Sequence, residues 1–174
     1  ALNSFGSATG SGDITINAGI LYLGLGGPAG AVAGNITNNS FGVFARSDTS
    51  QYNGQISGSG VVIKNSLGTL TLTGANTYTG GTTVAAGTLK GSTTSIQGNI
   101  TNNAAVVFDE VSAGTYGGTM SGSGSVTKQG TGIVTLTSGN SYSGGTLVNG
   151  GTLVVDNATG SGTGSGSVLM VFGK

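Results

Sequence analysis

The sequence GTLTLTGANTYTGGTTVAAGTL, residues 68–89, decides the fold because it returns as GIVTLTSGNSYSGGTLVNGGTL at residues 132–153. The first copy begins at Gly68 and the second at Gly132, and the two align without a gap in a 64-residue period. A fixed period of this kind is the signature of a repeat architecture, in which each unit packs only on its neighbours. We therefore expect a stack of similar units.

The residues that both copies share form a structural repeat signature. Glycine permits the left-handed turns needed where a chain turns a corner, and we expect Asn76 and Tyr78 to hold such corners. We assign none of these residues a catalytic, cofactor-binding or metal-binding role. The signature is Asn76, Tyr78, Gly80, Gly81, Thr82, Gly87 and Leu89 in the first copy, and Asn140, Tyr142, Gly144, Gly145, Thr146, Gly151 and Leu153 in the second.

The repeat extends beyond this stretch. Residues 35–89 recur at residues 99–153 with about half of the positions identical, and partial copies occupy both ends of the chain. We predict one domain, a single β-helix segment over residues 1–174. Residues 160–167, GSGTGSGS, are predicted to form a loop, because little in them can enter a core.

Short alternating segments predict strands. Leu70 and Leu72 share one side of a segment whose other side carries threonines, and Val134 and Leu136 repeat that apolar side. We predict an all-β fold, a right-handed parallel β-helix or solenoid, with each period making about three coils of roughly 20 residues. In this interpretation identical positions stack, so that leucines build the core and asparagines form amide ladders.

The charge content limits the partners. Five Lys and Arg residues balance five Asp and Glu residues, for a net charge of zero. Nucleic acid requires a basic surface, so we expect none as a partner, whereas weak repulsion between copies favours self-association. No apolar stretch is long enough for a membrane helix, so we expect this segment not to be embedded in a membrane. The N-terminus lacks a signal peptide pattern, and we interpret the chain as mature protein or as a fragment.

Catalytic residue types are scarce. Histidine and cysteine are absent, which excludes catalytic triads and imidazole or thiolate metal sites. The acidic pair Asp109-Glu110 is the remaining candidate, but consecutive strand residues point to opposite sides of a sheet. The matching positions of the first copy are Ala45 and Arg46. We interpret the pair as a solvated turn, and expect no enzyme activity, no cofactor and no metal.

A longer motif carries a family resemblance. The pattern SGSGxVxKxxxGxxTLT followed by NxYxGGTxVxxGTL occurs at residues 57–89 and again at residues 121–153. It resembles the passenger-associated repeat of autotransporters. The resemblance implies a right-handed β-helix in the passenger of a secreted or surface-displayed bacterial protein, and it covers a piece of passenger without the barrel that translocates it. The repeats of that family form stalks and have no single activity.

Three functional hypotheses remain at this point. The leading one is an extracellular structural or adhesive stalk, non-catalytic, with a protein or glycan ligand on a host or bacterial surface. The first alternative is an extracellular fibre that polymerises through exposed ends of the β-helix. The second is a polysaccharide-binding or polysaccharide-cleaving β-helix, in which Tyr78 and Tyr142 stack on sugars instead of covering the Gly-Gly turns.

Overall fold

The computed structural model describes residues 2–5 and 12–171, and all the regular secondary structure in these residues is β-strand. The strands are β1 Leu2–Phe5, β2 Ile14–Ile16, β3 Ile20–Leu23, β4 Ile36–Asn38, β5 Phe41–Phe44, β6 Ser50–Tyr52, β7 Ile56–Ser57, β8 Val61–Leu72, β9 Thr82–Gly91, β10 Ile100–Asn102, β11 Ala105–Asp109, β12 Ala113–Tyr116, β13 Met120–Ser121, β14 Ser125–Gln129, β15 Ile133–Leu136, β16 Thr146–Val148, β17 Thr152–Val155 and β18 Val168–Met170.

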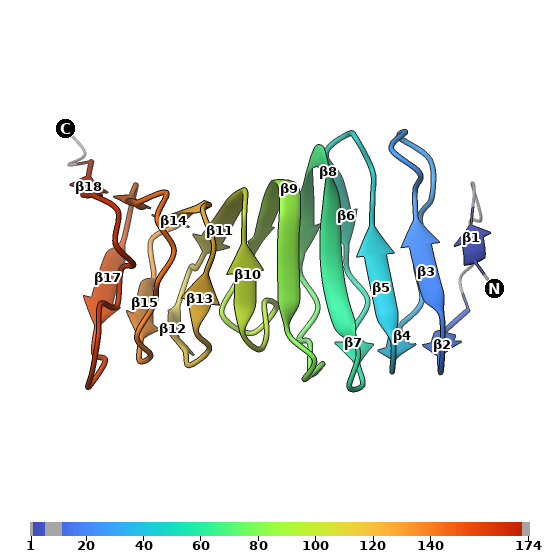
Figure 1. Cartoon of the computed structure of the whole chain (residues 1–174), viewed down its shortest axis with the longest axis horizontal. Coiled ribbons are helices and arrows are strands. Elements are labelled where there is room, and N and C mark those ends of the chain that lie inside the picture. Colours follow the sequence, from blue (N-terminus) through green and yellow to red (C-terminus); the bar gives the residue numbers. More distant parts are fainter. Residues whose placement is uncertain (1, 6–11, 172–174) are drawn as a thin grey trace.

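The strands stack into a solenoid of about eight turns. Every pair of named strands is parallel, and each strand pairs with the strand one coil before or after it, as Figure 1 shows along the length of the molecule. Parallel pairing at each rung follows from the alternating, glycine-punctuated segments of the sequence. The predicted all-β parallel solenoid is confirmed.

Three faces surround the solenoid axis. The first face is formed by β2, β4 and β7, is continued by residues 76–79 and 93–97, and ends with β12, β15 and β17. The second face carries β1, β3, β5, the first half of β8, the first half of β9, β10 and β13. The third face carries β6, the second halves of β8 and β9, β11, β14, β16 and β18. The long strands β8 and β9 join the second and third faces into one sheet.

The two sequence copies do not stack in phase, which corrects the expectation that identical positions lie above one another. Contacting positions of neighbouring coils, such as Asn35 and Gln55, lie 20 residues apart in the chain. Three coils of this length contain fewer residues than the 64-residue period of the sequence. The second copy therefore begins one face further round the solenoid. Its strand β10 has the same sequence as β4, yet β10 pairs with β9 on the second face, whereas β4 pairs with β7 on the first.

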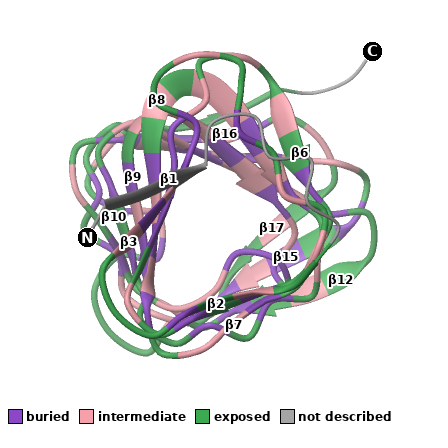
Figure 2. Cartoon of the chain, turned by 90° about the vertical axis from the view of Figure 1, so that its right-hand side faces the viewer, coloured by how far each residue is buried: buried purple, intermediate pink, exposed green. Residues whose placement is uncertain are grey.

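The core runs along the axis inside the three faces (Figure 2). The predicted inward leucines are there, since Leu70 and Leu72 are 2% and 1% exposed. Tilted aromatic pairs recur in both copies, with ring centroids 5.7 Å apart for Phe44 and Tyr52. The corresponding pair in the second copy, Phe108 and Tyr116, has centroids 5.2 Å apart. A narrow core filled by one or two side chains from each strand is what a short coil can enclose.

Stacked asparagines bond to each other at the surface, where Nδ2 of Asn39 donates to Oδ1 of Asn17 over 3.3 Å, but the buried asparagines bond to the main chain instead. Asn38 is fully buried and its amide donates to the carbonyl oxygen of Val61, 2.9 Å away. Asn102 makes the same bond to Ser125 at 2.8 Å. Because the copies are out of phase, Asn38 and Asn102 lie on different faces and do not stack. Each amide satisfies a main-chain group where a coil turns.

Residues 160–167 lie outside the strands, as a loop does, but they are not loose. Their main chain is bonded to the preceding coil, with Asn140 donating to Ser161 and Ser165 donating to Tyr142. Gly164 and Gly166 allow this close approach, because a Cβ at either position would collide with Tyr142 or Gly145 of the preceding coil. The small residues thus form a further part of the solenoid wall. The weak echo of the repeat at residues 9–12 falls largely outside the described residues.

No helix in the part of the chain that the structure describes is long and apolar enough to cross a membrane.

Candidate functional site

Each signature asparagine joins three successive coils. Asn76 is 4% exposed, and its Oδ1 accepts from the main-chain nitrogen of Ile56 at 2.7 Å while its Nδ2 donates to the carbonyl of Ser95 at 2.6 Å. Asn140 accepts from Met120 and donates to Gly162 over the same distances. A side-chain amide holds one donor and one acceptor in fixed directions, so this bridge fixes the spacing of the coils at the corner.

Each signature tyrosine lies in the core. Tyr78 and Tyr142 are 2% and 0% exposed, and burial raises the pKa of both phenols. The hydroxyl of Tyr78 is 2.8 Å from Oγ1 of Thr82, and that of Tyr142 is 2.5 Å from Oγ1 of Thr146. The sugar-stacking alternative is wrong for these rings, because neither presents a face to the solvent.

The signature glycines lie where coils approach closely. Gly81 and Gly145 adopt φ of 83° and 85°, a left-handed conformation that side chains disfavour. A Cβ added at Gly80 would lie 2.5 Å from the main chain of Gly60. Gly87 and Gly151 also have positive φ. Leu89 is fully buried, whereas Leu153, in the last coil, is only partly buried against the core.

Two buried lysines were missed by the sequence reasoning. Lys64 and Lys128 are each 1% exposed. The Nζ of Lys128 donates to the carbonyls of Gln129, Gly130 and Gly150 at 2.7, 2.9 and 3.2 Å, and that of Lys64 donates to Ser66 and Ala86. Burial lowers the pKa of both lysines. The signal was present, because alternation from buried Val62 or Val126 places the lysine two residues later on the inward side.

The neighbouring acidic residues Asp109 and Glu110 point to opposite sides of the solenoid wall. Asp109 faces outward and pairs with Lys90 at 2.8 Å, and the hydrogen bond to Lys90 lowers the pKa of that carboxyl. Glu110 is 5% exposed, so its assignment to a solvated turn is wrong. Its Oε2 accepts from the main-chain nitrogen and the hydroxyl of Thr93, at 3.0 and 2.9 Å. The opposite orientation of neighbouring strand residues keeps the two carboxylates from acting as a pair.

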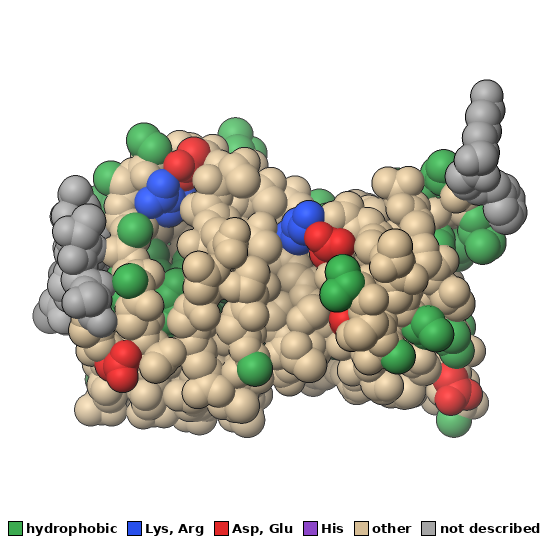
Figure 3. All heavy atoms as spheres, turned by 180° about the vertical axis from the view of Figure 1, so that it is seen from behind, with side chains coloured by type: hydrophobic (Ala, Val, Ile, Leu, Met, Phe, Trp, Pro, Cys, Tyr) green, Lys and Arg blue, Asp and Glu red, His purple; other side chains and the backbone are tan. Residues whose placement is uncertain are grey.

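Charge is sparse on the surface. Figure 3 shows one side of the molecule as mostly uncharged, with acidic and basic side chains in a few isolated places. Arg46 and Asp48 form an ion pair whose charged atoms are 2.7 Å apart. Among the described residues no three His, Cys, Asp or Glu side chains gather where a metal ion would fit.

Shallow depressions lie over the same turn of both copies. One of about 240 Å³ covers Gly80 and Gly81 and is edged by hydroxyl side chains such as Thr79 and Thr101. The other, of about 570 Å³, covers Gly144 and Gly145 and is edged by serines. Because the copies are out of phase, the two depressions lie on different faces. Such surfaces offer hydroxyl and main-chain groups to a ligand but no strong acid, base or nucleophile.

The two repeat motifs match a known protein family. Residues 62–90 and 126–155 each match the family model described as the passenger-associated-transport-repeat. The adhesin BmaC autotransporter of Brucella suis biovar 1 (strain 1330) is 44% identical over 79 residues, which make up 45% of this chain and 2% of the adhesin. The chain thus corresponds to a very small part of that relative. Comparison with solved structures gives no significant match.

Proposed function

Because the chain carries two passenger-associated-transport repeats, we propose that it is a non-catalytic stalk segment of an extracellular adhesive passenger, holding a neutral, hydroxyl-rich surface away from the bacterial cell. The repeat and the adhesin relative indicate a location at the cell surface or outside the cell. The observation that carries the proposal is the uninterrupted stack of about eight coils, bonded rung to rung along its whole described length. At about 4.8 Å for each coil, the stack spans roughly 40 Å.

The chemistry of the described residues supports a non-catalytic role. Asp109 is engaged by Lys90 on the outside, and Glu110 is engaged by Thr93 on the inside. Because these two side chains lie on opposite sides of the solenoid wall, they cannot flank one glycosidic bond as the carboxylate pair of a glycosidase does. The most distinctive residues of the repeat lie in the core or at the corners of the coils, where they stabilise the fold. The surface that remains is suited to many weak hydrogen bonds, which suits adhesion through repeated contacts.

Surface display tests the adhesive role. The chain is placed between an outer-membrane anchor and an N-terminal epitope tag on a non-adherent bacterium, and adherence to epithelial cells is counted. We expect adherence to exceed that of bacteria that display Gly80→Ala/Gly144→Ala, a variant in which the added Cβ atoms collide with neighbouring coils. Equal adherence at equal tag exposure would contradict the adhesive role.

A separate measurement tests the absence of catalysis. The purified chain is incubated with a panel of neutral and acidic polysaccharides, and reducing ends are measured. We expect no release above the buffer control. A hydrolysis rate that disappears in Asp109→Asn, with the circular dichroism spectrum unchanged, would show that the chain is an enzyme.

A further inference from the structure

A recess in the outer wall lies on the third face, where the long strands β8 and β9 end. Its volume is about 200 Å³. β9 ends at Gly91, and the chain then turns inward, so that Ile96 is fully buried. The short side chain of Ser92 is left between Thr73 and Asp109 of the neighbouring coils, and the wall is hollowed there. The polar side chains around the recess are Thr71, Thr73, Lys90, Ser92 and Asp109.

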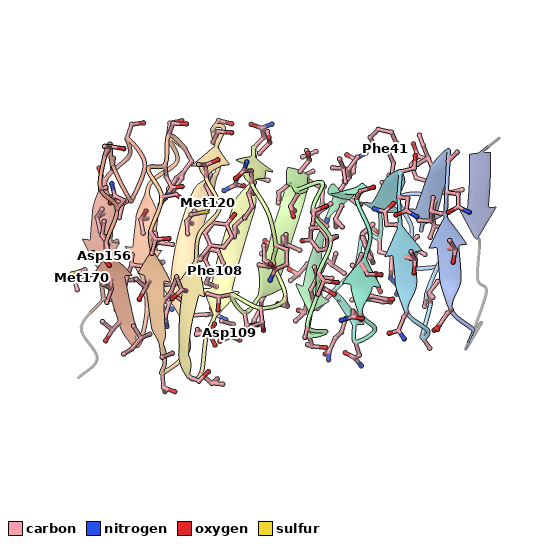
Figure 4. The ribbon with its side chains drawn as sticks, turned by 90° about the horizontal axis from the view of Figure 1, so that it is seen from below. Phe41, Phe108, Asp109, Met120, Asp156 and Met170 are labelled. Atoms are coloured by element: carbon pink, nitrogen blue, oxygen red, sulfur yellow. The ribbon has the colours of Figure 1, made fainter. Side chains whose placement is uncertain are left out.

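The recess contains an ion pair with unused hydrogen-bonding capacity. The Nζ of Lys90 is 2.8 Å from Oδ2 of Asp109, and the two side chains are 31% and 33% exposed. In Figure 4, Asp109 lies nearer the outer edge of the stack than its buried neighbour Phe108. One contact between an ammonium and a carboxylate uses one of three donors and one of about four acceptor positions. Both charged groups can therefore bond to a ligand while they remain paired.

The repeat itself does not require this ion pair. Lys90 of the first copy corresponds to Val154 in the second, and Asp109 of the second copy corresponds to Ala45 in the first. The copies share instead the residues that form the core and the corners. An ion pair on the outer side of a strand contributes little to stability. Lys90 and Asp109 are thus additions to a wall whose fold does not depend on them.

The charge and the size of the recess indicate the class of ligand. Lys90 and Asp109 balance each other, and an acidic ligand would bring a second carboxylate beside Asp109, so an uncharged ligand fits best. Two adjacent hydroxyl groups, as on a sugar ring, match the pair, because one can donate to the carboxylate and the other can accept from the ammonium. At about 200 Å³, the recess is smaller than the roughly 300–1,000 Å³ of pockets for drug-sized ligands. It has room for a single ring.

We propose that this recess binds a terminal neutral sugar of a cell-surface glycan, with Asp109 accepting from one sugar hydroxyl and Lys90 donating to the next. Thr71 and Thr73 offer further hydroxyl groups at the edge of the ring. The inference rests on the proposed adhesive function for the source of the glycan, and it names the chemical group that is bound. One shallow site binds weakly, and many copies displayed on one cell bind together.

Titration of the isotope-labelled, purified chain with single sugars tests the site by nuclear magnetic resonance. The probes are the methyl glycosides of glucose, galactose and mannose, with N-acetylneuraminic acid as the acidic comparison. We expect a neutral glycoside to shift the amide signals of Lys90, Ser92 and Asp109. Asp109→Asn should weaken this binding about tenfold, because it removes a charge-assisted hydrogen bond. The matched control is Asp48→Asn, which removes the carboxylate of the Arg46 ion pair away from the recess.

The outcomes decide the proposal. Binding of a neutral glycoside that Asp109→Asn weakens and Asp48→Asn leaves unchanged supports it. The proposal is overturned if none of the three glycosides shifts these signals, if Asp109→Asn binds equally well with an unchanged circular dichroism spectrum, or if N-acetylneuraminic acid binds more tightly.

Bacterial display separates this site from the adhesive function as a whole. Bacteria that display Asp109→Asn should adhere less than those that display the unchanged chain at equal tag exposure. Full adherence of this variant overturns the sugar site and leaves the adhesive function standing. Glycoside binding by a chain that confers no adherence supports the site and contradicts only the adhesive function.

Discussion

Lys128 places a cation inside the wall of the solenoid, where an unpaired charge is strongly disfavoured. Its ammonium group donates to three carbonyl oxygens of the turning chain, and that of Gln129 also accepts from the main-chain nitrogen of Glu110. We predict that Lys128→Met lowers the free energy of unfolding by about 1–3 kcal/mol, because the buried carbonyls lose their donor. Urea denaturation followed by circular dichroism measures the change.

Lys90 provides the matched control for that prediction. It carries the same charge on the same kind of strand, but it pairs with Asp109 at the surface. Lys90→Met should therefore change stability by less than about 1 kcal/mol. A loss from Lys128→Met no larger than that from Lys90→Met would show that the carbonyl contacts contribute little.

The buried tyrosines predict alkaline unfolding. Burial raises the pKa of Tyr52 to about 12, and it also raises the pKa of Tyr78, Tyr116 and Tyr142. In the unfolded chain tyrosine ionises near pH 10. The stability that comes from keeping the phenols neutral is therefore complete below about pH 10 and is lost as the pH rises from about 10 toward 12.

Absorbance at the tyrosinate band, recorded with circular dichroism, checks this behaviour. Ionisation of the four tyrosines should coincide with loss of strand signal. Burial lowers the pKa of Lys64 and Lys128, so their effect is to increase stability as the pH rises toward the ordinary pKa of lysine. Above that pKa both lysines are neutral in the folded and unfolded chain, and their effect on stability no longer changes with pH. Ionisation of the four phenols in a chain that keeps its full strand signal would contradict the prediction.

At the scale of single residues, alternation predicted most of the interior. It placed Leu70, Leu72, Val134 and Leu136 inward, and all four are buried. The prediction for Glu110 was wrong because a charged residue after a strand was taken to be solvated, although alternation from buried Phe108 places it inward and Thr93 supplies two donors from the preceding coil. Contacts between coils depend on which residues the corner brings together, and that is not visible in one strand.

Glycine at the corners sets how closely the strands stack. A Cβ at Gly80 would lie 2.5 Å from the main chain of Gly60 in the preceding coil, so that coil has to move. We predict that Gly80→Ala lowers the melting temperature and costs about 1–3 kcal/mol, as overpacking does. Thermal denaturation measures the shift.

Gly27→Ala serves as the control for the corner glycine. Nothing lies within 4 Å of a Cβ at this position. The substitution removes the same flexibility from the unfolded chain without a collision, so stability should be unchanged or slightly higher. If both variants lose the same stability, close approach of the coils is not the reason for glycine at position 80.

At the scale of strands and coils, the sequence predicted the strand type and the parallel stack but not the phase of the two copies. Val62 pairs with Thr82, and Thr82 in turn pairs with Ile100, so the second of these coils is shorter than the first. The length of each coil depends on how its corners close, so a sequence period need not be a whole number of coils. The phase between β4 and β10 therefore required the structure.

The repeated contacts predict that one whole period can be removed. Deletion of residues 36–99 joins Asn35 to Ile100 and replaces β4 by β10, whose sequence is the same. In the intact chain the hydroxyl of Tyr116 donates to the carbonyl of Gly98, and that of Tyr52 donates to the carbonyl of Gly34. The deletion removes Gly98 and Tyr52, and it places Tyr116 where it can donate to Gly34. All later coils turn by one face together, so no contact among them is lost.

We expect this deletion variant to fold and to be about 15 Å shorter, since a 64-residue period corresponds to a little over three rungs of about 4.8 Å. Small-angle scattering gives the maximum dimension, and circular dichroism confirms the strands. Deletion of one more residue, 36–100, provides the control, because a one-residue slip turns inward side chains to the outside and should prevent cooperative folding. If both deletions unfold, the phase of the copies is fixed by contacts between faces that a rigid turn of later coils does not preserve. If only the 64-residue deletion folds, the solenoid tolerates any number of periods, and successive copies present their surfaces on successive faces.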